Sequence, residues 1–592
     1  MCGIFATIGA GKQAPTAVVA GLKKLEYRGY DSWGVAFANA QGELGMFKQV
    51  GKISEFDEKQ HSLPPAQIAL GHTRWATHGG VKHENAHPHF DAAKTVAIAH
   101  NGIIENWQEL KKELQGRGIK FVSQTDSEIV AHLIGENLRA GLEFSKAATK
   151  AVARLTGRFA VVAMCRGARE IFAARRGSPL IVGLGQGQFF VASDIPAFLN
   201  QTQDVNFLDD EQGVILRPGG PEFFNLKSGQ PLAKRKIKID WQAGEAEKGD
   251  FSHFMLKEIF EQKETLNRAI AQDEDEIMKV ADQIKKAKGV FFVGAGTAGK
   301  VAHAGEYFFA NVAKRHTNFA PASEFPLFEH FLLPETLILA ISQSGETADV
   351  LEALETAEKA GSQIFSLVNT PGSSIARKSN KTIFIKAGPE KAVASTKAAT
   401  SQLAILLLLA FATAGRLQDG KKLLIETASN VSEMLNPRFV DHVEQIAKRI
   451  FKQENLFIIG KGANFPMALE SAIKIQEVSQ VHAEGFAGGE LKHGPIAMIE
   501  NGTPCLVLVG DDQWAGEILQ NAIELKARGA RIIGIAPNEN EVFDDFIRVP
   551  KAGPANPILN LIPVQLLAFF LGVLRGKNPD MPQNLAKSVT VK

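Results

Sequence analysis

The first 240 residues alternate short apolar runs with turn-forming Gly, His and Asn residues. Clear examples are MCGIFATIG at 1–9, AQIALGHTRW at 66–75, KTVAIAHNG at 94–102 and RFAVVAMC at 158–165. Two helical patterns interrupt these runs, near residues 14–25 and 127–138. Short strands with frequent turns are typical of a layered α+β domain. The charged stretch 234–250 then predicts a connection between domains.

From about residue 270 the pattern changes to alternating strands, loops and helices, which predicts a parallel α/β architecture. This part also repeats itself. GVFFVGAGTAG at 289–299 is echoed by NLFIIGKGANF at 455–465, and AGSQIFSLVN at 360–369 is echoed by RGARIIGIAP at 528–537. The first two segments start 166 residues apart and the second two 168 residues apart. Two copies of one doubly wound domain explain this agreement best.

Length and composition set limits on this picture. A chain of 592 residues predicts about three or four domains at roughly 150 residues each. Lys and Arg number 66 against 64 Asp and Glu, a net charge of +2, and this balance argues against a nucleic-acid binder. The three cysteines are too few for a disulfide scaffold and favour a reducing compartment. We therefore expect a cytoplasmic protein.

The apolar segments do not predict a membrane protein. No apolar run reaches the roughly 18 residues that a membrane span needs, and the longest candidate, Leu403–Ala414, is better explained as a buried core helix. The N-terminal sequence MCGIFATIGAGK lacks the basic region that begins a secretory signal. We expect neither a membrane nor a nucleic acid as a partner.

Cys2 is the candidate nucleophile of the first domain. A small second residue usually permits removal of Met1, which would leave a thiol and a free α-amine on one residue. An α-amine with a pKa of about 7.7–8.0 can act as the general base that activates the thiol. Taken alone, Cys2 is better explained as a small residue that begins a strand.

Other polar residues at predicted strand ends would complete an amide-hydrolysing site. Asn101 and Gly102 can form an oxyanion hole from a side-chain amide and a backbone N–H. Arg74 and Asp126 supply the cation and the anion that an amino-acid substrate requires. Each also has a simpler explanation: a turn for Asn101-Gly102, a surface ion pair for Arg74 and a helix cap for Asp126.

Together, the motifs MCGI, YRGYDS at 27–32, HTRWATHG at 72–79, HNGIIEN at 100–106 and TDSE at 125–128 resemble the class II glutamine amidotransferases. This resemblance covers about the first 240 residues. It implies that Cys2 attacks the glutamine amide, that Asn101 and Gly102 form the oxyanion hole, and that Trp75 gates the passage of ammonia. It also implies a glutamine-binding set: Arg74, Thr77, His78 and Asp126. Trp33 stands where the family commonly has a small residue.

The first α/β repeat holds a candidate phosphate cradle. The segment 335–361 reads as an apolar strand, the polar turn SQSGET and a helical pattern. The turn offers hydroxyl and amide groups at the positive N-terminus of that helix, where a phosphate would bind. These groups belong to Ser342, Gln343, Ser344 and Thr347. Serine-rich capping of the helix explains the same residues about equally well.

This turn and the G-x-G repeats resemble SIS (sugar isomerase) domains. VASTKA at 393–398 resembles a second sugar-contact segment of these domains, with Val393 and Ser395 at matching positions. In the first loop, GAGTAG at 294–299, Thr297 is retained but Ala298 stands where the family has a serine. Loss of one hydroxyl contact typically costs on the order of 1 kcal/mol, so the resemblance implies a weaker but intact phosphate site.

The second repeat and the C-terminus carry candidate acids and bases. Glu470, Lys474 and Glu477 share one stripe of a predicted helix, which by itself is typical of a solvated, salt-bridged face. His493, in a loop flanked by Gly and Pro, could carry protons near pH 7. Lys587 lies in the terminal segment NLAKSVTVK, where a lysine is ordinarily only solvated.

In this order, ALESAIKIQE at 468–477, HAEGFAGGELKHGP at 482–495 and NLAKSVTV at 584–591 resemble the glucosamine-6-phosphate synthase family, the isomerising glutamine–fructose-6-phosphate aminotransferases. The resemblance spans essentially the whole chain. It implies that L-glutamine and fructose 6-phosphate are the substrates and that the product, glucosamine 6-phosphate, begins hexosamine synthesis.

The same resemblance assigns roles at the sugar site. It implies that Lys587 forms a Schiff base with the open-chain ketose, that Glu477 moves a proton between C1 and C2, and that Lys474 assists. His493 would help to open the sugar ring and would come from the partner subunit of a homodimer. Ala586 would contact the sugar phosphate.

The predicted organisation is an α+β N-terminal nucleophile domain, an αββα sandwich, followed by two α/β SIS domains with doubly wound parallel sheets. The predicted boundaries are 1–240 for the glutaminase domain, 241–430 and 431–579 for the SIS domains, and 580–592 for a catalytic tail. Side chains suffice for this chemistry, so we expect no cofactor. We also expect no metal site, because His83, His87 and His89 lack convincing companion ligands.

Two alternatives stay open at this stage. A deaminase or isomerase of another amino-sugar phosphate would share the SIS domains, and Ala298 slightly favours it. A sugar-phosphate sensor would bind without chemistry, but a sensor would need none of Cys2, Glu477, His493 and Lys587.

Overall fold

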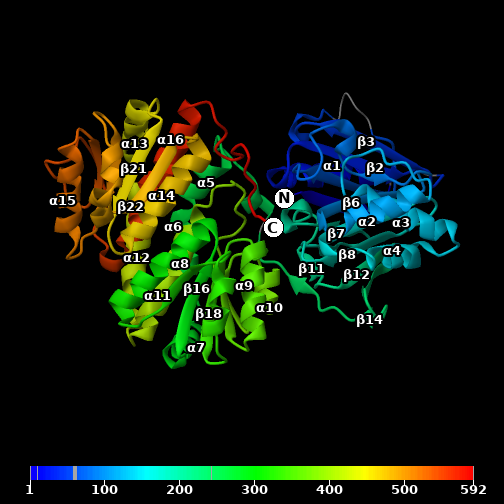
Figure 1. Cartoon of the computed structure of the whole chain (residues 1–592), viewed down its shortest axis with the longest axis horizontal. Helices are drawn as coiled ribbons and strands as arrows, with labels where there is room; N and C mark the ends of the chain where they lie inside the picture. Colours follow the sequence, from blue (N-terminus) through cyan, green and yellow to red (C-terminus); the bar gives the residue numbers. More distant parts are fainter. Residues whose placement is uncertain are drawn as a thin grey trace. The chain divides into compact units, whose positions relative to one another are not determined.

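The computed structural model describes residues 2–9, 11, 13–39, 41–57, 63–241 and 243–590. The chain forms two compact units (Figure 1). The first consists of residues 1–247 together with 586–592, and the second of residues 248–585.

The first unit contains two antiparallel sheets. One has the strand order β15-β11-β9-β10-β1-β4-β2-β3 and the other β14-β13-β12-β8-β7-β6-β5. The strands are β1 Gly3–Ile8, β2 Ser32–Ala38, β3 Leu44–Val50, β4 Ile68–Arg74, β5 His89–Phe90, β6 Val96–Ile104, β7 Gly157–Cys165, β8 Ile171–Arg176, β9 Ile181–Leu184, β10 Phe189–Ala192, β11 Asp204–Phe207, β12 Gln212–Arg217, β13 Gly220–Asn225, β14 Pro231–Leu232 and β15 Ile237–Lys238. The helices are α1 Ala14–Lys24, α2 Trp107–Gly116, α3 Glu128–Arg139 and α4 Phe144–Val152.

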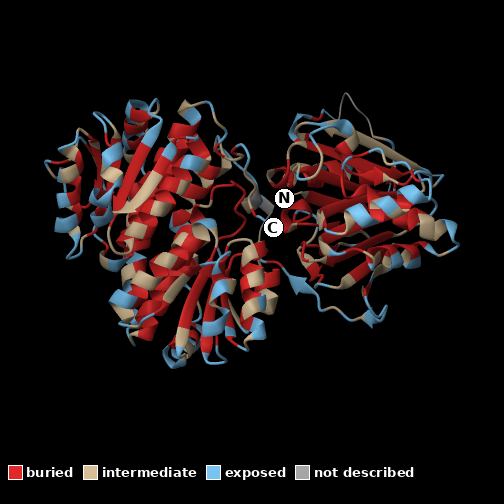
Figure 2. Ribbon diagram, viewed as in Figure 1, coloured by how far each residue is buried: buried red, intermediate tan, exposed pale blue. Residues whose placement is uncertain are grey.

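Successive residues of the central strands face opposite layers, which explains why the runs are apolar throughout. In β1, Phe5 packs with Val18 and Leu22 of α1, whereas Ile4 belongs to the core between the two sheets. Helices α3 and α4 pack against the other face of the second sheet through residues such as Ala147. Figure 2 shows the resulting buried layers. The predicted αββα sandwich is confirmed.

The structure explains one departure from the family pattern and amends one expectation in this unit. Trp33 fits in place of a small residue because its ring lies fully buried against Phe47 and Phe56, at centroid distances of 5.3 and 4.9 Å. The predicted connection 234–250 is not entirely linker, since β15 lies within it and pairs with β11 at the edge of the first sheet.

The second unit contains two five-stranded parallel sheets with equivalent strand orders, β17-β16-β18-β19-β20 and β22-β21-β23-β24-β25. The strands are β16 Gly289–Gly294, β17 Asn318–Pro321, β18 Thr336–Ser342, β19 Gln363–Val368, β20 Lys381–Phe384, β21 Asn455–Gly460, β22 His482–Ala487, β23 Pro504–Leu508, β24 Arg531–Ala536 and β25 Asp545–Arg548. The repeated segments of the sequence form β16 and β21, which occupy the same place in their sheets, as do β19 and β24. The predicted pair of doubly wound domains is confirmed.

Helices cover both sheets and join them through a common core. They are α5 Phe254–Phe260, α6 Gln262–Ile270, α7 Glu274–Lys286, α8 Gly296–Phe308, α9 Ala348–Lys359, α10 Ser374–Lys378, α11 Lys397–Thr413, α12 Leu417–Met434, α13 Pro437–Ile450, α14 Asn464–Ser479, α15 Ala515–Lys526 and α16 Asn556–Leu574. Helix α8 of the first repeat packs on α14 of the second, so the loops that follow β16 and β21 lie near one another.

One long apolar helix was not predicted from the sequence. The segment Gly553–Leu574 is long and apolar enough to cross a membrane by length and composition. Asn560, Pro563 and Gln565 interrupt its apolar sequence, so the segment does not stand out as a single apolar run. The protein buries 83% of its most apolar window, as expected for a core helix. Helix α11 is likewise buried along its whole length.

Candidate functional site

Cys2 lies immediately before β1 and contacts the end of β4. Its Sγ accepts a hydrogen bond from the backbone N–H of Trp75 at 3.2 Å, and the Trp75 carbonyl lies 3.5 Å from the same sulfur. Burial raises the pKa of the Cys2 thiol, although the Trp75 N–H and the Arg74 guanidinium oppose this effect. A thiol that stays protonated needs a base to become a nucleophile.

The backbone of Cys2 is fixed by Arg28, which the sequence reasoning did not select. The Nε of Arg28 donates to the Cys2 carbonyl at 3.2 Å, and its Nη1 pairs with Asp194 at 3.0 Å. The hydroxyl of Tyr27 donates to the same Asp194 carboxylate at 2.6 Å. Arg28 and Tyr27 lie within the quoted YRGYDS motif, but no local signal connects that motif with residue 194.

Asn101 is also directed toward Cys2. Its Nδ2 donates to the Cys2 carbonyl at 3.1 Å, while its Oδ1 lies 3.1 Å from Nε2 of His72. Burial lowers the pKa of His72 to about 3, so its ring is neutral at physiological pH. Since Nε2 of His72 also lies 3.0 Å from the His100 carbonyl, it carries the proton. His72 therefore fixes the Asn101 amide with its NH₂ group toward Cys2.

Position 102 requires glycine. Gly102 lies in β6 with φ +111°, and a Cβ atom there would be 2.0 Å from the carbonyl oxygen of Arg158 on the neighbouring strand. Any larger residue would displace β6 from β7 next to Asn101.

Arg74 organises the loop that follows β4. Its guanidinium donates to the carbonyls of His78, Gly79 and Gly80 at 2.5, 2.9 and 3.1 Å. This loop carries Thr77, which is exposed, and His78, whose ring faces Trp107 at 6.2 Å. The buried Asp126 carboxylate accepts from the backbone N–H of Ile104 at 2.8 Å, and its charge acts on the pKa values of Arg74 and His100.

In the first unit, the structure thus places a thiol, an amide donor, a buried cation and a buried carboxylate around the ends of β1, β4 and β6. The indole of Trp75 contacts Tyr30 edge-on at 5.4 Å and stays partly exposed. Such a set can bind an amino acid by both charged groups and cleave its side-chain amide.

In the second unit, the turn after β18 is held by its own hydroxyl groups. Ser342 Oγ accepts from the Gly345 N–H at 3.0 Å and lies 3.1 Å from Thr347 Oγ1. Ser344 Oγ accepts from the Glu346 N–H at 3.2 Å. The carbonyl of Gln343 accepts from Asn369 of the next loop at 3.2 Å. The turn leads directly into α9, whose N-terminus adds positive potential.

The segment before α11 is stabilised by Glu390. Its carboxylate accepts from the backbone N–H groups of Thr396 and Ala398 at 2.9 and 3.0 Å and from Ser395 Oγ at 3.0 Å. The N–H of Val393 donates to the Asp580 carbonyl at 3.0 Å. Glu390 thus serves as a cap for α11 in addition to fixing Ser395.

A buried charged cluster joins the two repeats. Lys474 Nζ lies 2.5 Å from Glu477 and 3.6 Å from Glu470, and Glu470 accepts a hydrogen bond from Thr297 at 3.0 Å. The Lys474 and Glu470 side chains are 1% and 2% exposed, so this stripe of α14 is not a solvated face. Burial lowers the pKa of Lys474, but the carboxylates of Glu477 and Glu470 outweigh it and raise the pKa above its ordinary value.

Glu470 makes the stability of this cluster depend on pH. Burial raises its pKa from 4.5 to about 7 against the charge of Lys474, so the folded state holds this proton more tightly than the unfolded state. The contribution is therefore fully present below pH 4.5 and is lost as pH rises to about 7. At 1.36 kcal/mol per pH unit this amounts to about 3 kcal/mol.

We expect the stability difference between wild type and Glu470→Gln to shift by this amount between pH 4.5 and 7.5, in favour of the variant at the higher pH. Thermal unfolding at several pH values measures it. A pH-independent difference would contradict a raised pKa for Glu470.

Three further residues were predicted for the sugar site: His493, Ala586 and Lys587. His493 is exposed at the end of a short 3-10 helix, Gly488–His493. Ala586 and Lys587 belong to the stretch that groups with the first unit.

Comparisons with known proteins identify the two kinds of domain. The SIS domain model matches residues 283–412 and 449–571, and the glutamine amidotransferase domain model matches residues 72–200. The chain is 43% identical to the glutamine–fructose-6-phosphate aminotransferase (isomerizing) of Pyrococcus horikoshii and 40% identical to that of Aquifex aeolicus, over 100% of both chains in each case.

Among solved structures, the C-terminal domain of glucosamine-fructose-6-phosphate aminotransferase from Francisella tularensis matches with a TM-score of 0.52 and 29% identity. It covers 57% of this chain and 100% of that one. A structure from Clostridium novyi, at 18% identity and a TM-score of 0.52, shares the fold over 57% of this chain. By its full-length relatives, this chain belongs to the family of glutamine–fructose-6-phosphate aminotransferases (isomerizing).

Proposed function

We propose that the protein converts L-glutamine and fructose 6-phosphate to L-glutamate and glucosamine 6-phosphate, the first step of amino-sugar synthesis. The observation that carries the proposal is that a single chain contains both Cys2, whose carbonyl accepts from Asn101, and a buried Lys474–Glu477 ion pair. The full-length relatives described above are glutamine–fructose-6-phosphate aminotransferases (isomerizing).

The glutaminase half would begin at Cys2. After removal of Met1, the α-amine takes the thiol proton, and the sulfur attacks the amide carbon of glutamine. Asn101 and Gly102 would stabilise the oxyanion, and the C–N bond would break as the amine returns the proton to the leaving ammonia. Water then hydrolyses the thioester to glutamate. Arg74, Thr77, His78 and Asp126 would hold the substrate.

The sugar half would use the two repeats. The sugar phosphate would bind at Thr297, Val393, Ser395, Ala586 and the turn with Ser342, Gln343, Ser344 and Thr347. Lys587 would form a Schiff base with C2 of the open-chain sugar, and ammonia would displace the lysine. Glu477 would then carry a proton from C1 to C2, with Lys474 balancing its charge. Trp75 would gate ammonia transfer and so limit its loss to water.

The proposal includes a homodimer and a division into working parts. His493 would open the sugar ring in the site of the partner subunit, and its exposed position on this chain suits that role. The working parts are the glutaminase domain at 1–240, the two SIS domains at 241–430 and 431–579, and the catalytic tail at 580–592. A cytoplasmic location fits the free thiols of Cys2, Cys165 and Cys505, and cell fractionation tests it.

The decisive experiment is a coupled assay with purified protein, glutamine and fructose 6-phosphate. We expect glutamate and glucosamine 6-phosphate in equal amounts and no amino sugar when either substrate is omitted. Glutamate without amino sugar would refute the sugar assignment, and Ala298→Ser would then test whether the missing hydroxyl is responsible.

A further inference from the structure

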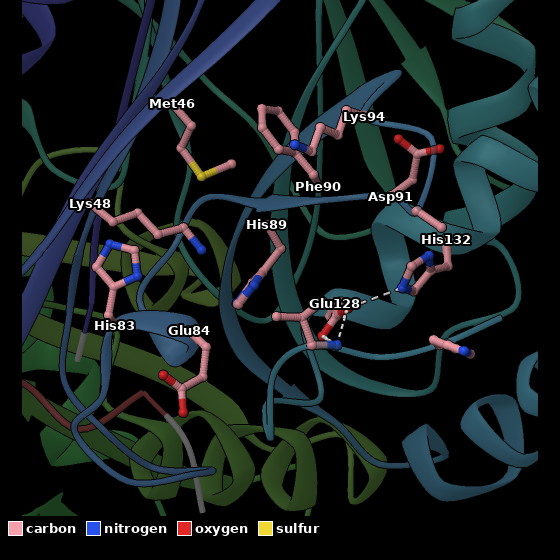
Figure 3. A pocket seen from close by; sticks show the side chains of 13 residues that line it. Met46, Lys48, His83, Glu84, His89, Phe90, Asp91, Lys94, Glu128 and His132 are labelled. Carbon is pink, nitrogen blue, oxygen red and sulfur yellow. Dashed lines mark hydrogen bonds and ion pairs between the residues drawn. The ribbon is translucent and has the colours of Figure 1, made fainter.

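A cavity of about 360 Å³ lies within the first unit, away from Cys2 (Figure 3). Its wall comes from β3, β5, α3 and the short 3-10 helix His83–Asn85. In Figure 3 the amino end of Lys48 points toward the ring of His89. Two further lysines, Lys94 and Lys120, complete the basic lining.

Two of the three carboxylates that line this cavity accept hydrogen bonds from other groups of the protein. Glu128 accepts from the N–H groups of Val122 and Ser123 at 2.9 and 2.6 Å and from His132 at 3.1 Å. Asp91 accepts from the N–H groups of Thr95 and Val96 at 2.6 and 2.8 Å. Only Glu84 remains among the acidic lining residues without such donors in the described part of the chain.

The three lysines are not neutralised in the same way. Across the described residues, no hydrogen bond or ion pair is formed by the amino groups of Lys48, Lys94 and Lys120. Burial lowers the pKa of Lys48 to about 8 in spite of the charges of Glu128 and Glu84. The half-buried Lys48 ammonium feels these charges but makes no direct ion pair with a described residue, and a bound anion would offset the cost of its burial.

Two walls of the cavity are connected to the glutamine site. Nε2 of His89 lies 3.1 Å from Thr125 Oγ1, next to Asp126. In the 3-10 helix that supplies the lining residues His83 and Glu84, Asn85 Nδ2 donates to the Gly80 carbonyl at 3.0 Å, and Arg74 donates to that same carbonyl at 3.1 Å. The segment that carries Thr77 and His78 is therefore held between Arg74 and this wall.

We propose that this cavity binds a small phosphate-bearing anion and that the bound anion tightens glutamine binding. Lysine ammonium groups bind phosphate as point charges, and here the half-buried Lys48 supplies one while the exposed Lys94 and Lys120 supply two more. An anion between Lys48, Lys120 and the His83–Asn85 helix would fix Asn85, and through Gly80 the loop with Thr77 and His78. A pre-ordered loop binds substrate with a smaller entropic cost. The coupling, but not the binding, rests on the glutaminase function proposed above.

Isothermal titration of the full chain with inorganic pyrophosphate tests the site. Fructose 6-phosphate is kept at saturation, so that the proposed sugar-phosphate site is filled. We expect saturable binding of one pyrophosphate per chain, weakened at least about tenfold by Lys48→Met or Lys120→Gln. Lys146→Met is the matched control, because Lys146 is exposed on α4 and does not line the cavity. The absence of saturable binding, or equal binding by all variants, would overturn the proposal.

Glutamine hydrolysis tests the coupling. We expect pyrophosphate to lower the KM for glutamine about fivefold in wild type and Lys146→Met, with kcat unchanged and with no such effect in Lys48→Met. Chloride at equal ionic strength should have no effect. An unchanged KM at saturating pyrophosphate would refute the coupling. A protein that does not hydrolyse glutamine would refute the glutaminase function instead, while the titration would still decide the site.

Discussion

Replacement of Cys2 by alanine is expected to abolish glutamine hydrolysis, with a loss of more than about 10³-fold in kcat. The Sγ atom is the only thiol sulfur within the site formed by Asn101, Arg74 and Asp126 in the described part of the chain, and no hydroxyl at residue 2 could replace it in the variant. Glutamate release from glutamine measures the effect.

The same variant should leave the sugar half intact. Isomerisation of fructose 6-phosphate in the absence of ammonia should need only the residues of the proposed sugar site, among them Lys474 and Glu477. Cys165→Ala is the matched control, since Cys165 is a buried free cysteine in the same unit and should have little effect on either activity. Glutaminase activity retained by Cys2→Ala would refute the assigned nucleophile.

Sequence periodicity was sufficient for the fold because both units follow simple patterns. Buried strands read as apolar runs, and the echo between residues 289–299 and 455–465 corresponds to β16 and β21 at equivalent places in two sheets. Helix α16 was missed as an apolar helix because three polar or helix-breaking residues interrupt it, although its neighbours in the core tolerate them.

Residues of the candidate site could be predicted only where they lie within a short, recognisable sequence motif. Asn101 and Asp126 were found from local sequence, but Asp194 was not, because its partner Arg28 is 166 residues away and nothing near Asp194 marks it. His72 was overlooked within a quoted motif, since its role arises from the contact between β4 and β6 that brings it to Asn101. Burial of the charged residues could not be predicted from their spacing either. Glu470 and Lys474 have the spacing of a solvated helix stripe, but their side chains are buried.

Replacement of Lys474 by methionine is expected to lower stability and remove amino-sugar formation together. The change leaves Glu470 and Glu477 without their shared cation in a buried site, which typically costs about 3–5 kcal/mol. Part of this cost is avoided at low pH, because Glu470 can take up a proton. The variant should therefore be closest to wild-type stability below pH 5, as thermal unfolding would measure.

The chemical effect of Lys474→Met is separable from the effect on folding. Glu477 would lose the cation that balances its proton transfer, and we expect kcat for glucosamine 6-phosphate formation to fall about 10²–10⁴-fold under conditions in which the variant is folded. Lys448→Met, which breaks an exposed Lys448–Glu444 pair on α13, is the matched control and should change stability by less than about 1 kcal/mol.

Glutamine hydrolysis by the same samples provides the internal reference, because the cluster around Cys2 lies in the other unit and should be unaffected. A folded Lys474→Met protein with wild-type amination would show that the buried pair with Glu477 serves the packing of α14 alone. Loss of amination at full stability would show the reverse, that the charge is needed for proton transfer and not for folding. We expect stability and amination both to fall, and only stability to recover at low pH. That outcome would show that Lys474 serves the packing of α14 and the proton transfer alike.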